Sequence, residues 1–67
     1  MSINYSKAIL LLRSKLDLSQ EEFGKLIGAS LVSVSRWERG EFEPTKIVKV
    51  RIDELILKHQ IKVQEEE

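Results

Sequence analysis

The residues best suited to chemistry lie in one short stretch, 31–39, with the sequence LVSVSRWER. This stretch holds Arg36 and Arg39 among small and apolar side chains, and its first acidic residue is Glu38. A guanidinium presents its N–H donors as a planar fork, which matches the O6 and N7 acceptors of guanine as well as the oxygens of phosphate. The stretch therefore favours recognition of an anionic, hydrogen-bonding partner over bond-making chemistry.

The rest of the chain contains no recognisable catalytic or metal-binding set. His59 is the only histidine, there is no cysteine, and no carboxylates stand near His59 at the spacing of metal ligands. The pairs Glu21–Glu22 and Asp53–Glu54 are sequence neighbours. Neighbours on a helix point about 100° apart, so neither pair makes a two-carboxylate acid–base site. We expect no enzymatic activity, no metal and no cofactor.

Two short helices are predicted to position the arginine-bearing stretch. Ser19 with Glu22 three residues later forms a capping box, which marks a helix start. That helix is expected to end near Gly28, because glycine accepts the positive φ of a tight turn. Ser30 then caps the next helix, and Gly40 terminates it in a left-handed conformation. Two helices joined in this way form a helix-turn-helix.

The apolar residues of these two helices fall where the helices would touch. Gly24 stands at the expected crossing, and since glycine costs about 0.5–1 kcal/mol of helix propensity, its presence indicates a steric demand. Trp37 is the largest inward residue and is predicted to close the core. The inward positions are Phe23, Ile27, Ala29, Val34 and Trp37.

Helical periodicity continues on both sides, which predicts a compact all-α domain of four to five helices. Asn4 or Ser6 is expected to cap the first helix. Its apolar stripe is Tyr5, Ile9, Leu12 and Leu16. After a loop that ends at a proline, a last helix is expected from Thr45 to about His59. Its inward face is Val48, Ile52, Leu55, Ile56 and His59. Residues 48–52 alternate like a strand, but a lone strand would have no partner.

The 67 residues are predicted to form one domain over 1–60, followed by an acidic tail at 61–67. The net charge is zero, yet residues 1–40 hold six basic and four acidic residues, whereas residues 41–67 hold five and seven. The positive excess thus lies in the half that carries the two arginines. The three terminal glutamates are expected to be frayed and to point away from any bound phosphate. The start lacks signal-peptide features, no apolar run approaches the roughly 20 residues of a membrane span, and we expect a cytoplasmic protein.

Residues 12–45 resemble the phage repressor/Cro type of helix-turn-helix, the XRE-like family with its lambda repressor-like fold. The resemblance rests on Ser-Gln-Glu-Glu at 19–22, Gly28 at the turn, Arg-Trp-Glu-Arg-Gly at 36–40 and Pro44 four residues on. It covers about half of the chain. It implies that the domain binds double-stranded DNA through a recognition helix over residues 30–39.

The resemblance also implies a role for each matching position. Gln20 is expected to brace against phosphate and the start of the recognition helix, and Arg39 to lie along the DNA backbone. Arg13 is expected to pair with Glu38 and so to tie the first helix to the third. The positions that face base edges are Leu31, Val32, Ser33 and Arg36. The complete predicted DNA-binding set is Ser19, Gln20, Ser30, Leu31, Val32, Ser33, Arg36, Arg39 and Lys46.

The chain departs from the family pattern at several positions. Leu31 and Val32 are apolar where the family often has Gln, Arg or Ser, so contacts to thymine methyl groups are expected there. Glu41 and Glu43 make a usually basic loop acidic, and they would face phosphate unless turned aside. No separate fifth helix is evident, since the segment after Ile52 continues as one helix, as in some antitoxin relatives.

These features predict a sequence-specific transcriptional regulator, a repressor that occupies an operator. One such domain covers few base pairs, so we expect a homodimer on a palindromic site. The first alternative is an antitoxin whose tail beyond Leu57 binds a toxin. The second is a helix-turn-helix that binds only protein. No membrane partner is expected. The apolar candidates for a dimer face are Leu10, Leu11, Ile56, Leu57 and Ile61.

Overall fold

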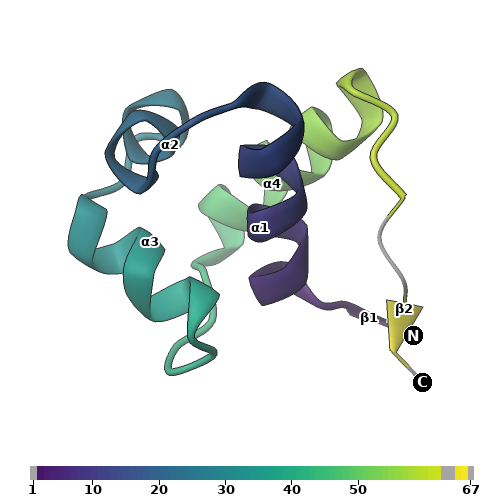
Figure 1. The fold of residues 1–67 in the computed structure, drawn as a ribbon. Helices are drawn as coiled ribbons and strands as arrows, with labels where there is room; N and C mark the ends of the chain where they lie inside the picture. Colours follow the sequence, from purple (N-terminus) through teal and green to yellow (C-terminus); the bar gives the residue numbers. More distant parts are fainter. Residues whose placement is uncertain (1, 63–64, 67) are drawn as a thin grey trace.

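The structure is a computed structural model that describes residues 2–62 and 65–66. Within these residues the chain forms four α-helices around one core (Figure 1), which confirms the predicted all-α class. The helices are α1 (Tyr5–Leu16), α2 (Gln20–Ile27), α3 (Leu31–Glu38) and α4 (Lys46–Lys58). Two short strands, β1 (Ser2–Ile3) and β2 (Glu65–Glu66), pair at the edge of the domain.

Most of the helices begin at the predicted caps. Asn4 accepts a hydrogen bond from the backbone of Lys7, and Ser30 accepts one from the backbone of Ser33. Ser19 and Glu22 form both bonds of the capping box. The N–H of Ser19 donates to the Glu22 carboxylate, and this bond, followed by the one from the Ser19 side chain, lowers the pKa of Glu22. Thr45 precedes α4 as predicted, but its side chain makes no capping bond.

The buried core takes residues from all four helices. α1 lies at its centre and packs against both α3 and α4, while α2 packs against α3. Trp37 is 8% exposed, so the prediction that it fills the core is confirmed. The fully or nearly fully buried apolar residues are Ala8, Ile9, Leu12, Phe23, Ile27, Val34, Trp37 and Ile52.

The turn between α2 and α3 is tight because two glycines permit it. Gly28 ends α2 with φ 75°, and the N–H of Ala29 donates to the carbonyl of Gly24 at 2.7 Å. A Cβ atom on Gly24 would lie only 2.5 Å from the carbonyl oxygen of Ala29. Real Cβ atoms do not approach an oxygen so closely. The steric demand inferred for Gly24 is therefore present in the structure.

α4 shows how helical packing overrides the strand-like alternation of residues 48–52. Ile52 is buried and Val48 packs against the core, while Val50 is 52% exposed on the opposite side. Ile47 and Leu57 also face outward, at 71% and 78% exposed. A helix uses every third or fourth residue as its inner face, so the β-branched residues between them are left at the surface.

The acidic tail differs from expectation. The backbones of Glu65 and Glu66 do not fray but pair antiparallel with Ile3 and Ser2. Extended segments at the two ends of the chain satisfy each other's backbone groups, whatever the charge of their side chains. Ile61, assigned to the tail, packs against the core. Glu67 lies outside the described residues.

Candidate nucleic-acid interface

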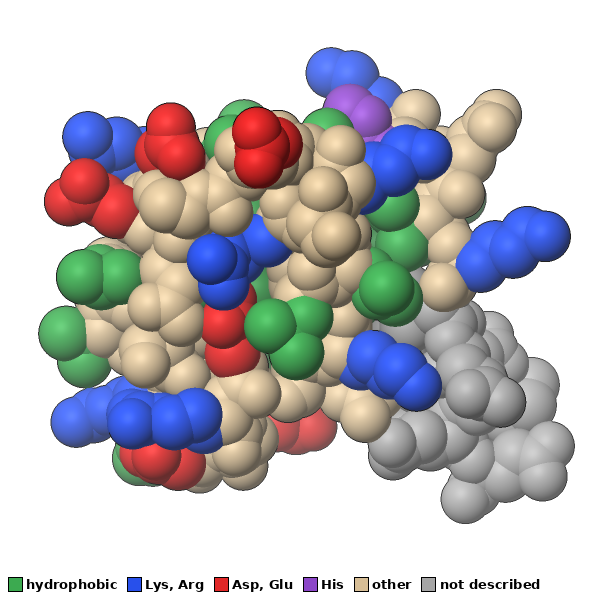
Figure 2. All heavy atoms as spheres, in the orientation of Figure 1, with side chains coloured by type: hydrophobic (Ala, Val, Ile, Leu, Met, Phe, Trp, Pro, Cys, Tyr) green, Lys and Arg blue, Asp and Glu red, His purple; other side chains and the backbone are tan. Residues whose placement is uncertain are grey.

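The outer face of α3 carries the predicted base-reading residues and is open to solvent. Leu31 and Val32 are 47% and 58% exposed, and Arg36 is exposed on the same side. Val34 and Trp37 occupy the opposite face and are buried. In Figure 1, α3 lies at the left edge of the domain, and in Figure 2 hydrophobic side chains lie at the middle of this edge, with basic and acidic side chains above and below them. The helix thus presents small, apolar and basic groups to solvent.

A partly buried polar network fixes α3 against the rest of the domain. Arg13 on α1 donates to both carboxylate oxygens of Glu38, at 2.9 and 2.8 Å, and its Nε donates to the carbonyl of Leu18. The Glu38 side chain is only 8% exposed. The acidic residue of α3 is consequently turned inward, and its charge is matched by an arginine within the protein. The Arg13–Glu38 pair that the resemblance implied is present.

Gln20 joins this network at the end of α3, whereas the resemblance implied that it braces the start of the recognition helix. Its Nε2 donates to Oε1 of Glu38 at 2.8 Å, so α2 and α3 are linked as well as α1 and α3. An amide nitrogen carries two hydrogens, so one donor remains beyond this bond. Gln20 and Glu38 are eighteen positions apart and lie on different helices, so no periodic signal in the sequence indicated the contact.

Three serines predicted to contact DNA stand at helix starts. The backbone N–H of Ser33 and its hydroxyl each lie 3.1 Å from the hydroxyl of Ser30, so both side chains are engaged at the first turn of α3. Ser19 occupies the equivalent place on α2 and is exposed. Lys46, the first residue of α4, is also exposed.

The loop after α3 engages three nearby cations. Arg39 Nε lies 3.0 Å from a carboxylate oxygen of Glu41, and Lys49 Nζ lies 3.5 Å from one of Glu43. The acidic residues expected near phosphate are therefore turned aside toward the protein's own cations. Arg36 contacts an aromatic ring instead of a carboxylate. Its Cζ lies 5.4 Å from the ring centroid of Phe42. Phe42 was not among the predicted site residues, although an aromatic residue in an otherwise polar loop was a usable signal.

A second polar contact joins α1 to α4 away from this face. The hydroxyl of Tyr5 donates to Oδ1 of Asp53 at 2.9 Å, and Lys49 lies over the Tyr5 ring at 5.2 Å. Burial, followed by the bond to Asp53, raises the pKa of Tyr5 to about 12. The contact holds α4 against α1 and takes no part in the α3 surface.

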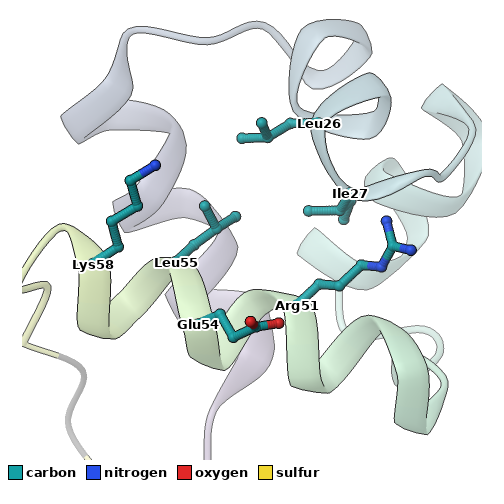
Figure 3. A pocket seen from close by; sticks show the side chains of 6 residues that line it. All are labelled: Leu26, Ile27, Arg51, Glu54, Leu55 and Lys58. Atoms are coloured by element: carbon teal, nitrogen blue, oxygen red, sulfur yellow. The ribbon is translucent and has the colours of Figure 1, made fainter.

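Three hollows among the described residues have no lining residue from α3. One opens between α2 and α4 (Figure 3), with three aliphatic side chains on α2 and α4 and charged residues along α4. Its lining residues are Leu26, Ile27, Arg51, Glu54, Leu55 and Lys58. Among the described residues, no group of His, Cys, Asp or Glu side chains is placed to hold a metal ion. None of the described helices is long and apolar enough to cross a membrane.

The four-helix fold and the exposed second helix of its motif define a helix-turn-helix protein. The profile of a helix-turn-helix family matches residues 9–55, and the chain belongs to this family, of the XRE-like type found in phage repressors. The match begins within α1 and ends within α4, so it includes most of the core as well as the motif.

A relative supports the same assignment. A stretch of 32 residues is 50% identical to Repressor protein C2 of Salmonella phage P22. This stretch covers 48% of the chain but only 15% of that repressor. No solved structure matches the chain. The family match and this relative both assign the chain to the helix-turn-helix class.

Proposed function

We propose that this protein is a sequence-specific transcriptional repressor that occupies an operator with α3 in the major groove. The observation that carries the proposal is the outer face of α3, which is exposed, narrow and free of acidic groups because Glu38 is turned inward. A helix with short side chains fits the major groove, which is about 12 Å wide. The similarity to a protein named as a repressor supports regulation by occupancy.

We assign base contacts to the first two turns of α3. Arg36 is the residue that can donate two hydrogen bonds to O6 and N7 of one guanine. Leu31 and Val32 are exposed apolar groups suited to the methyl group of thymine. Ser33 can donate or accept, so it contributes little discrimination by itself.

The phosphate contacts come from residues around this helix. Gln20 is held by Glu38 and retains one amide hydrogen for a phosphate oxygen. Arg39 must exchange Glu41 for phosphate, which lowers the gain from that contact. The helix starts and the first residue of α4 complete the assigned set, which is Ser19, Gln20, Ser30, Arg39 and Lys46.

We further propose that two copies bind a palindromic site, with recognition helices about one DNA turn apart. Of the five residues considered for the dimer face, Ile56 and Ile61 pack against the core and contribute mainly to folding. Leu10, Leu11 and Leu57 are 47%, 37% and 78% exposed, so they are the remaining candidates.

The test is selection of bound duplexes from a random pool at stated salt, followed by a salt titration on one selected and one random duplex. The proposal predicts an enriched palindrome and a steep loss of affinity with salt on both duplexes. Absence of binding to any duplex at low salt would instead favour the protein-interaction alternative. Binding to DNA together with a toxin encoded beside it would favour the antitoxin alternative.

A further inference from the structure

Phe42 is an aromatic residue whose position the core does not explain. It lies in the loop after α3 and is 59% exposed, so it contributes little to the buried core. The contact that the structure gives it is with the guanidinium of Arg36, at 5.4 Å from Cζ to the ring centroid. This distance is within the range of a cation–π interaction. An exposed phenylalanine costs solubility without a compensating gain in core packing.

The loop backbone holds Phe42 where it can make this contact. Gly40, with φ 74°, reverses the chain at the end of α3, and the N–H of Glu41 donates to the carbonyl of Arg36 at 3.0 Å. On the other side Pro44 is buried. Phe42 is thus fixed between two anchored positions, one of which is the backbone of Arg36 itself.

A ring and a carboxylate act differently on an arginine. The carboxylate of Glu41 forms an ion pair with Arg39 and offsets its charge, so Arg39 must give up this partner to bind DNA. The ring of Phe42 attracts the Arg36 cation without accepting its hydrogen bonds or cancelling its charge. A free arginine side chain has large rotamer entropy, and each rotamer fixed in advance lowers the cost of binding.

We propose that Phe42 is a positioning residue that restricts Arg36 in the free protein and thereby raises selectivity for the base pair that Arg36 reads. The inference rests on the proposed function, since it assigns a base contact to Arg36. It predicts that Phe42 affects discrimination at one base pair rather than affinity for all DNA. The energy of an exposed cation–π contact corresponds to a change of about two- to fivefold in that discrimination.

The experiment measures binding of the full chain to the duplex selected with wild-type protein and to duplexes with each base pair substituted in turn. The variants are Phe42→Leu, which keeps an apolar side chain of similar size, Phe42→Ala, and Phe42→Tyr, which keeps the ring. Phe42→Leu and Phe42→Ala should lower the discrimination about two- to fivefold at the Arg36 base pair only. Phe42→Tyr should restore it. The salt dependence and the thermal midpoint should not change.

Two further measurements separate positioning from a direct contact of Phe42 with DNA. In an Arg36→Ala background, Phe42→Leu should have no further effect, because the contact acts through Arg36. Without DNA, the Nε–H signal of Arg36 should shift in Phe42→Leu and stay near its wild-type position in Phe42→Tyr.

The outcomes that overturn the proposal are distinct. Discrimination unchanged in Phe42→Leu, lowered equally at every base pair, or still lowered when Arg36 is absent would each contradict it while leaving the proposed function intact. If wild-type protein selects no sequence at all, the proposed function fails and the role of Phe42 fails with it.

Discussion

The two faces of α3 differ in almost every physical property although they belong to the same eight residues. The inner face is formed by Val34 and Trp37, which are buried, and by Glu38, whose carboxylate accepts three hydrogen bonds from α1 and α2. The outer face, with Leu31, Val32 and Arg36, is exposed. Changes to the inner face should be measured as loss of folding, and changes to the outer face as loss of DNA binding.

The inner face should show the largest effect on stability. Trp37→Ala removes the largest side chain that joins α3 to the core and should lower the free energy of unfolding by about 3–5 kcal/mol. Urea denaturation followed by circular dichroism measures this change. Val32→Ala on the outer face is the matched control and should change stability by less than about 0.5 kcal/mol. Equal losses in the two variants would show that the assignment of the faces is wrong.

Two ion pairs, one on the inner side of α3 and one exposed after it, allow the same comparison of stability. Glu38→Ala leaves Arg13 without its carboxylate in a partly buried site and should cost about 1.5–3 kcal/mol of stability. Glu41→Ala removes the exposed partner of Arg39 and should cost less than about 1 kcal/mol. The same denaturation experiment compares them. If Glu41→Ala lowers the free energy of unfolding as much as Glu38→Ala does, burial does not determine how much each ion pair contributes to stability.

On the outer face, Arg36→Ala should weaken binding to the selected duplex by about 1–3 kcal/mol and relax the preference at one base pair. Its unfolding free energy should stay within about 0.5 kcal/mol of wild type. Fluorescence anisotropy on matched and substituted duplexes measures the effect. Lys58→Ala, which removes an exposed cation from α4, is the control and should leave selectivity unchanged. Unaltered selectivity in Arg36→Ala would remove Arg36 from the base-reading residues.

Substitutions in the loop after α3 should give the smallest change in DNA affinity per residue and no change in sequence preference. Glu41→Lys with Glu43→Lys replaces two acidic groups beside α3 with basic ones and frees Arg39 and Lys49 from their partners. Affinity should rise on every duplex, and the salt slope should steepen by about 0.9 for each additional phosphate that the protein neutralises. Glu54→Lys on α4 adds the same kind of charge elsewhere. If the double variant binds no more tightly than Glu54→Lys, the loop lies away from the duplex.

Local signals allowed the sequence to predict most of the fold. A cap, a glycine or an apolar stripe acts within one or two turns, so Ser19 with Glu22, Ser30 and Gly28 identified the limits of α2 and α3. Gly24 indicated the close crossing because no other residue fits there. For α4, the alternating residues 48–52 allowed either a strand or a helix. The helix was predicted because a lone strand would have no other strand to pair with.

The contacts that the sequence did not predict join residues without a shared period. The bond from Gln20 to Glu38, the bond from Tyr5 to Asp53 and the ring contact of Phe42 with Arg36 each depend on the path of an intervening turn or loop. Side-chain patterns predict which face is buried, but they do not predict which of several polar groups on that face will meet. The pairing of β1 with β2 was missed for the same reason, since it uses backbone groups alone.

The most direct test of the separation between the two faces is an NMR titration of the labelled protein with the selected duplex. We expect the backbone amide signals of residues 30–36 to shift most, and those of the outward residues Ile47, Val50 and Leu57 of α4 to shift little. Shifts concentrated on α4, or no shifts on α3 at low salt, would contradict the claim that the outer face of α3 binds DNA.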